Sequence, residues 1–220
     1  QRIAIARALL TGPQLLLMDE PMAALDLARK NELMPYLERL TRELDIPVLY
    51  VSHAPDEVAR LAHHIVAMDA GKVVADGPLA EVLSRVDLPI RLGEDAGVVL
   101  EGVVIERDAQ WHLARVAFPG GCLWVRDGGH TQGAVVRIRI LARDVSLALA
   151  PSPDTSLLNS LPVVVDEVGD ENHPALALCR LRVGTSSSLL SRLTRRSAAA
   201  LNLQPGQNVW AQIKAVALIG

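Results

Sequence analysis

The sequence predicts a protein of two parts, an α/β domain followed by an all-β small barrel that is OB-like. In residues 1–84, short continuous apolar runs alternate with apolar residues at helical spacing, which is typical of a parallel sheet covered by helices. From residue 98 onward, apolar residues recur at every second position in short segments, and long helical patterns are absent. We therefore expect an α/β domain over 1–84, a linker over 85–97 and a β-barrel domain over 98–220.

The first domain should begin with a helix and then alternate strand and helix. The helical pattern ends at Gly12-Pro13, because Gly can adopt a left-handed turn and Pro cannot extend a helix. The run LLLM at 15–18 has the continuous apolar character of a strand covered on both faces. We expect Pro35 to bend the following helix or to delay its start. The expected elements are a helix over 2–11, a strand over 15–18, a helix carrying Leu33, Leu37, Leu40 and Leu44, a strand over 47–52, a hairpin of 65–69 and 72–76, and a helix over 78–84.

Polar side chains follow both expected strands of this domain. Asp19 and Glu20 come directly after the first strand, and His53 comes after the second. The strand and helix order implies parallel strands joined by right-handed crossovers, so both strands end at one edge of the sheet. Ligands bind at this edge in open α/β sheets. We therefore expect these three side chains to share a crevice.

The second domain should consist of short strands in two related sets. A break rich in Pro, Ser and Asp at 151–156 separates the sets, which predicts subrepeats over 98–150 and 157–219. One short helix is expected over about 195–202, after the capping residue Thr194. The expected strands are 98–107, 111–118, 122–126, 134–140, 145–149, 161–168, 175–183 and 207–218.

The composition excludes several classes of function. Aromatic residues make up only 3% of the chain and the net charge is −3, so neither stacking platforms nor a basic surface for nucleic acid is expected. Cys122 and Cys179 are too few and too far apart for a disulfide framework or a metal knuckle, which favours a reducing, cytosolic setting.

Two features bear on membranes and on chain length. Charged residues, Pro or Gly interrupt every apolar run before the roughly 20 residues that a membrane-spanning helix needs, so a membrane partner should be docked from outside. Two arginines, Arg2 and Arg7, lie in the first apolar stretch, which excludes a signal peptide. The chain does not begin with Met, and we expect it to be the interior of a longer protein.

Three short motifs stand in a fixed order in the first domain. LLLMDEP at 15–21 places an Asp-Glu pair after an apolar strand, ALD follows at 24–26, and the next strand ends at His53. Together these motifs resemble the ABC ATPase family, in which they are the Walker B strand, the D-loop and the switch histidine. QRIAIARALL at 1–10 is similar to the helix that follows the signature loop of that family. The resemblance covers 1–84 and implies part of a P-loop NTPase fold of the ABC type.

Each motif also has a bland interpretation. Taken alone, an Asp-Glu pair at a strand end is typical of a solvated turn, and a histidine that ends a strand is more often structural. The order and spacing of all three motifs favour the ATPase interpretation. The remaining histidines form no ligand pattern, because adjacent His63 and His64 cannot both face one metal ion.

The resemblance assigns a role to each polar residue, with ATP and Mg²⁺ as cofactors. Phosphoryl transfer to water needs a carboxylate near the metal ion, and Asp19 would hold Mg²⁺ directly or through a water. Glu20 would orient and deprotonate the attacking water. His53 would bond the γ-phosphate and align the water with Glu20. Asp26 would contact the opposing subunit of a nucleotide-sandwich homodimer.

The phosphate-binding half of such a site is missing from the sequence. A Gly-x4-Gly-Lys loop is needed to surround the phosphates, and the one Gly-Lys pair, Gly71-Lys72, has Val66 where the first Gly should stand. The glutamine loop and the signature loop, which in the family precede Gln1, are missing as well. We therefore expect this chain alone not to hydrolyse ATP.

Three segments of the second domain carry a further resemblance. ARDVSL at 142–147, LLN at 157–159 and IKAV at 213–216 are similar to the C-terminal region of molybdate-importer ATPases, which ends in a barrel of the TOBE or Mop type. Such barrels hold a tetrahedral oxyanion with short donors and one cation, which suits a dianion. The residues that match are Thr155, Ser156, Asn159 and Lys214. Their alternative interpretation is ordinary turn and strand chemistry in a structural or dimerisation domain.

Three functions stay open at this point. The first is the ATP-binding subunit of a molybdate or tungstate importer, which would dimerise beneath transmembrane permease subunits on the cytoplasmic face of the membrane. The second is a non-enzymatic oxyanion-binding module with a regulatory or storage role. The third is the ATPase of an importer for sulfate, sugar or polyamine.

Overall fold

The computed structural model describes residues 2–87, 91–92, 95–152, 154–171, 173–214 and 216–219. They form two compact units, with the division between His63 and His64, and we describe each unit by itself. The segment after His63, which the sequence places at the end of the α/β domain, belongs to the second unit. The linker predicted over 85–97 lies partly outside the described residues, because 88–90 and 93–94 are not among them.

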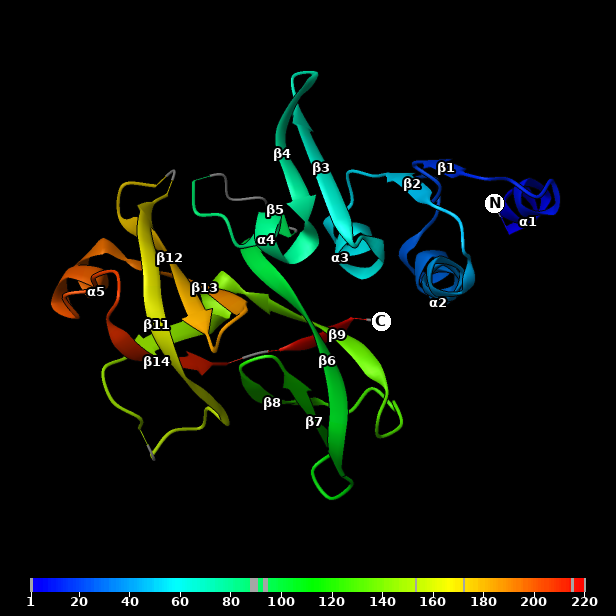
Figure 1. Cartoon of the computed structure of the whole chain (residues 1–220). Coiled ribbons are helices and arrows are strands. Elements are labelled where there is room, and N and C mark those ends of the chain that lie inside the picture. Colours follow the sequence, from blue (N-terminus) through cyan, green and yellow to red (C-terminus); the bar gives the residue numbers. More distant parts are fainter. Residues whose placement is uncertain are drawn as a thin grey trace. The chain divides into compact units, whose positions relative to one another are not determined.

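The first unit contains two parallel strands and three helices (Figure 1). Strands β1 and β2 pair from Leu16 opposite Val48 to Asp19 opposite Val51, so both carboxyl ends lie at the same edge. This arrangement is the parallel pairing that the order of the motifs predicts. The elements are α1 (Arg2–Leu10), β1 (Leu16–Asp19), α2 (Leu27–Glu43), β2 (Val48–Val51) and α3 (Pro55–Leu61).

Helix α2 begins directly after its N-terminal cap residue, Asp26. The Asp26 side chain accepts a hydrogen bond from the backbone N–H of Arg29 at 2.9 Å, which satisfies one of the unpaired donors of the first turn. Pro35 lies inside this helix and does not delay its start. The ring is exposed, so it has room on the solvent side, and the helix continues to Glu43.

The core of the first unit lies on one face of the two strands. The buried side chains come from β1, the turn after it, α2 and α3, and they are Leu16, Met18, Met22, Leu33, Met34, Leu37 and Leu61. The other face is bare, because Leu17 is 64% exposed and Leu49 is 56% exposed. The prediction that the first strand is covered on both faces is therefore wrong for the described residues, which supply a covering layer on one side only.

The second unit is rich in β-structure, as the alternating pattern predicts (Figure 1). Its elements in chain order are β3 (His64–Asp69), β4 (Lys72–Pro78), α4 (Leu79–Leu83), β5 (Arg91–Leu92), β6 (Asp95–Asp108), β7 (Leu113–Phe118), β8 (Gly121–Arg126), β9 (Val135–Leu141), η1 (Ala142–Asp144), β10 (Val145–Ala148), β11 (Asn159–Asp170), β12 (Leu176–Val183), β13 (Ser187–Thr194), α5 (Arg195–Ala200), β14 (Asn208–Ile213) and β15 (Ala217–Ile219). The β3–β4 hairpin turns at Ala70-Gly71, and α5 follows the cap residue Thr194, as the sequence predicts for both.

Strands β5 to β15, called the barrel region below, form two sheets. Each sheet contains one strand from the other half of this region's sequence. One sheet has the order β10–β14–β11–β12–β13, and the other has the order β15–β9–β6–β7–β8 with β5 beside β6. Strand β10 from the first half pairs with β14, where Val145 lies opposite Ile213. Strand β15 from the second half pairs with β9, where Leu218 lies opposite Ile138. Each half thus completes the sheet of the other, which the sequence did not predict.

The prediction and the structure differ for one predicted strand and for one strand that the sequence does not predict. The single strand expected over 207–218 is two strands, β14 and β15, that belong to different sheets. Strand β13 was missed, because its Ser-rich sequence is typical of a loop. It is nevertheless a core strand, since Leu189 and Leu190 are buried and Ser191 donates a hydrogen bond to the Val145 carbonyl at 2.6 Å.

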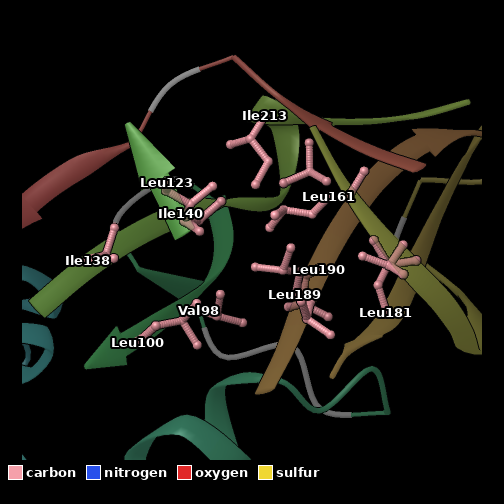
Figure 2. Close-up of a cluster of buried hydrophobic side chains, with 14 of the residues drawn as sticks. Val98, Leu100, Leu123, Ile138, Ile140, Leu161, Leu181, Leu189, Leu190 and Ile213 are labelled. Atoms are coloured by element: carbon pink, nitrogen blue, oxygen red, sulfur yellow. The ribbon is translucent and has the colours of Figure 1, made fainter. Parts of the chain in front are cut away.

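One hydrophobic core lies between the two sheets (Figure 2). Leu123 and Ile140 extend from one sheet, and Leu161 and Ile213 extend from the other toward them. The core is almost entirely aliphatic, and Phe118 is its one aromatic member among the described residues. Because both halves of the sequence contribute, this region folds as a single body.

Candidate functional site

Glu20 and His53 are in direct contact at the carboxyl edge of β1 and β2. The Nδ1 atom of His53 lies 2.5 Å from Glu20 Oε1, and the backbone N–H of His53 donates to the same oxygen at 3.2 Å. The histidine side chain is 83% exposed and the glutamate side chain is 33% exposed, so a ligand can reach both. This contact confirms that the ends of the two strands bring these residues together.

The backbone of Glu20 is held in an unusual conformation. Its φ angle is +44°, in the left-handed region that costs a non-glycine residue roughly 1–2 kcal/mol. Two backbone hydrogen bonds fix it, because its N–H donates to the Val51 carbonyl at 2.9 Å and its carbonyl accepts from Ala23 at 3.1 Å. Strain of this kind concentrates at functional sites, and here it directs the carboxylate toward His53.

Asp19 lies at the same edge and is exposed. It is the last residue of β1 and stands opposite Val51 in the strand pair. No group of three or more His, Cys, Asp or Glu side chains within the described residues could hold a metal ion by itself. That finding is compatible with Mg²⁺, which is usually bound by one or two carboxylates together with substrate phosphates and water. Asp19 is an exposed carboxylate at the end of β1, and its oxygens are ligands of the kind that a hard cation prefers.

Asp26 has a structural role in the chain as described. Besides capping α2, its carboxylate lies 3.7 Å from Nε of Arg29, and both side chains are largely exposed. An exposed ion pair of this kind contributes little to stability, typically below about 1 kcal/mol. The carboxylate consequently remains accessible from solvent on the side of α2 where the helix begins.

Glu57 is a residue of this region whose contacts the sequence did not reveal. It is only 3% exposed and accepts hydrogen bonds from Lys30 Nζ at 3.0 Å, Tyr50 Oη at 2.8 Å and Ser52 Oγ at 2.8 Å. Its place in the first turn of α3 favours an acidic residue because of the helix dipole, and this local effect gives no indication of the three donors. The one signal in the sequence was a carboxylate four residues after His53, and that spacing alone indicates no partner.

The four oxyanion candidates in the barrel region do not form one cluster of free donors. The amide of buried Asn159 is paired with the backbone of Trp124, accepting from its N–H at 2.7 Å and donating to its carbonyl at 2.8 Å. Lys214 is exposed and follows Ile213, which lies opposite Asn159. Thr155 and Ser156 are exposed in the preceding loop, and Thr155 Oγ1 accepts from the Leu157 N–H at 3.2 Å.

The barrel region also contains two free cysteines, Cys122 and Cys179. Burial raises the pKa of Cys179 to about 11, whereas Cys122 is half-buried and accepts hydrogen bonds from the Arg115 guanidinium.

Among the described residues, no helix is long and apolar enough to cross a membrane.

A family model for the TOBE domain matches residues 155–220. The match covers β11 to β15 and therefore includes the strand that completes the sheet of the first half. A solved structure titled as the cytoplasmic molybdate-binding protein ModG, in a form with molybdate bound, aligns with a TM-score of 0.45 and 26% identity, covering 55% of this chain and 93% of that one.

Curated relatives match the chain over its whole length. It is 65% identical over 219 residues to the molybdenum import ATP-binding protein ModC of Methylococcus capsulatus, and it covers 61% of that protein. It is 66% identical over 220 residues to the protein of the same name from Thiobacillus denitrificans, of which it covers 60%. The chain thus spans about three fifths of the length of the curated relatives that it matches. Over the part of them that it covers, the chain is thus similar in sequence to proteins named as molybdenum import ATP-binding proteins.

Proposed function

We propose that this chain is part of an ABC-type ATPase, the ATP-binding and hydrolysing subunit of a molybdate importer. The single observation that carries the proposal is the contact between Glu20 and His53 at the carboxyl edge of two parallel strands. The names of the relatives, which are molybdenum import ATP-binding proteins, support the same function. The ATPase part corresponds to 1–84, and the barrel part to 98–220.

The site residues would divide the work of hydrolysis among them. Glu20 would accept a proton from the attacking water, and His53 would keep the carboxylate in place while its other ring nitrogen faces the γ-phosphate. Asp19 would hold Mg²⁺, directly or through a water, and the ion would neutralise phosphate charge. Asp26, exposed at the start of α2, would contact the opposing subunit of a homodimer.

The other groups that hydrolysis needs would come from parts of the full-length protein outside this sequence. The phosphates need a glycine-rich loop with a lysine, and the sequence of this chain contains none. We propose that the full-length protein supplies this loop and the signature loop, so the chain alone is inactive. The subunit would work as a peripheral protein on the cytoplasmic face of the inner membrane, bound to transmembrane permease subunits.

The Glu20→Gln variant of the full-length protein tests the proposed base. Glutamine keeps the size of the side chain but cannot accept a proton, so turnover should fall at least about 100-fold while ATP still binds. Hydrolysis is measured by phosphate release, and binding by retention of labelled ATP. Near-normal phosphate release would show that Glu20 is not the base.

The cargo is proposed from the barrel region. We propose that Lys214, Thr155 and Ser156 donate to molybdate or tungstate, and that Asn159 orders the wall of the site through Trp124. Both oxyanions are tetrahedral dianions of similar size, which suits a cation with several short donors. This part could also act as an oxyanion-binding regulatory or storage module without any hydrolysis.

Titration calorimetry of the whole chain with molybdate, tungstate and sulfate tests the cargo. Binding of molybdate and tungstate should weaken about tenfold or more in Lys214→Ala, because a charge-assisted hydrogen bond is lost. Lys72→Ala, which removes another exposed lysine from the β3–β4 hairpin, is the matched control. Heat with sulfate alone would favour a sulfate importer, and no heat with any anion would remove the proposed site.

A further inference from the structure

A buried polar network stands directly behind the Glu20–His53 contact. Its centre is the Glu57 carboxylate, which is almost fully removed from solvent. Each of its three donors comes from a different element: Lys30 from α2, Tyr50 from β2, and Ser52 from the turn that follows β2. The carboxylate therefore ties two helices and a strand to the turn that carries His53.

The network holds that turn on both sides of His53. Ser52 donates its hydroxyl hydrogen to Glu57 and accepts a hydrogen bond from the Ala54 N–H at 3.0 Å with the same oxygen. Between these two residues, the His53 N–H donates to Glu20 at 3.2 Å. The backbone around His53 is thus fixed by two sets of hydrogen bonds, one from Glu57 through Ser52 to Ala54 and one from His53 to Glu20, and the peptide backbone of 52–54 joins them.

The charge balance of the network suits a rigid support. Burial by itself would raise the pKa of Glu57, but the hydrogen bonds from Lys30, Tyr50 and Ser52 outweigh that effect and hold the pKa below its ordinary value. An ionised carboxylate with three donors is a satisfied group, and removal of its charge would leave the partly buried Lys30 ammonium without its counter-charge. Substitutions within the network should therefore weaken it, and its loss should loosen the turn that carries His53.

We infer that Glu57 is a positioning residue, which acts through Ser52 and the turn to hold His53 against Glu20. The inference rests on the proposed ATPase function for its purpose, but the geometry can be tested without any activity. Glu57 is not in contact with Asp19 or Glu20 among the described hydrogen bonds, so it acts only through the residues between them.

Hydrogen exchange of single backbone amides in this 220-residue chain is the direct test. In Glu57→Gln, the amides of His53 and Ala54 should exchange about tenfold faster, because the hydrogen bonds that protect them loosen. The matched control is Glu38→Gln, since buried Glu38 pairs with Arg60 at 2.5 Å and joins the same two helices away from the turn. The control should leave both amides within about twofold of the unmodified chain.

The outcomes separate positioning from general stability. Faster exchange at His53 in Glu57→Gln alone supports the inference, and equal effects of both variants, or none, overturn it. Should Glu57→Gln fail to fold, Tyr50→Phe takes its place, because it removes one donor and keeps the ring. Acceleration at His53 in that variant supports the inference, and unchanged exchange contradicts it.

A second measurement in the full-length protein addresses function. Glu57→Gln should lower kcat for ATP hydrolysis about tenfold with KM for ATP within about twofold, and Glu38→Gln should leave both unchanged. A rise in KM without a fall in kcat would contradict the assignment. If the unmodified protein hydrolyses no ATP, the proposed function fails, while the exchange data still decide whether Glu57 positions His53.

Discussion

At the residue scale, the sequence correctly places polar side chains at the ends of strands. It does not show which polar side chains are buried or what they contact. Glu20 and His53 could be paired from the sequence, because two parallel strands joined by a helical crossover must end at one edge. The left-handed backbone of Glu20 could not be predicted, since that conformation is imposed by hydrogen bonds to Val51 and Ala23. The contacts of Glu57 could not be predicted for a related reason: Lys30 is distant in the sequence, and the nearby Tyr50 and Ser52 reach the carboxylate only because the chain folds back between β2 and α3.

The lowered pKa of Glu57 predicts how the first unit responds to acid. Because its pKa is lower in the folded chain than in the unfolded chain, the unfolded state takes up a proton first as the pH falls. The stability that Glu57 contributes is fully present above its ordinary pKa and is lost as the pH falls through the folded value. Amide exchange in β2 and α3, followed from about pH 7 to about pH 3.5, measures this loss.

Glu57→Gln supplies the comparison for that experiment. This variant should start less stable at neutral pH and should lose less stability on acidification, because its side chain has no proton to gain. Parallel pH curves for the two proteins would contradict the prediction. A steeper curve for the variant would reverse the sign and would show that the carboxylate is not stabilised by its donors.

At the element scale, the sequence predicted strands by their apolar pattern and failed where that pattern was broken. Strand β13 has a Ser-rich sequence, yet Leu189, Leu190 and Ser191 are buried, so tertiary packing overrides local preference. For strand β1 the prediction is wrong in the opposite direction, because it expects more burial than the structure has. Its continuous apolar run indicates two covered faces, whereas Leu17 is exposed, and covering such a side chain is worth roughly 1.5–3 kcal/mol.

At the scale of the whole molecule, the exchanged strands determine how the barrel region can fold. In the first half of this region β9 pairs with β6 on one edge, and its other edge has no partner until β15 pairs with it. Among the described residues, β10 pairs with β14 of the second half. The core between the sheets draws on both halves, for example through Ile140 and Ile213. Two independent barrels are therefore not available to this sequence.

Residues 95–150 alone should consequently fail to fold. The isolated half would expose apolar core residues and the unpaired edge of β9, which favours aggregation. Residues 64–219, which contain both halves, should fold and serve as the control. Amide chemical-shift dispersion distinguishes the two results, and a well-dispersed spectrum of 95–150 would contradict strand exchange.

The sequence by itself determined the local features of this protein. It predicted the parallel strand pair, the hairpin, most strands of the barrel region, and the polar residues Glu20 and His53 at the strand ends. These features follow from patterns within a few residues, such as apolar period, caps and turns. Tertiary structure alone decided the strand exchange, the place of β13 and the network around Glu57. The strand exchange, the place of β13 and the Lys30–Glu57 pair depend on contacts between residues far apart in the chain, and the Tyr50 and Ser52 contacts depend on how the chain turns between β2 and α3. A local apolar pattern carries no information about such partners.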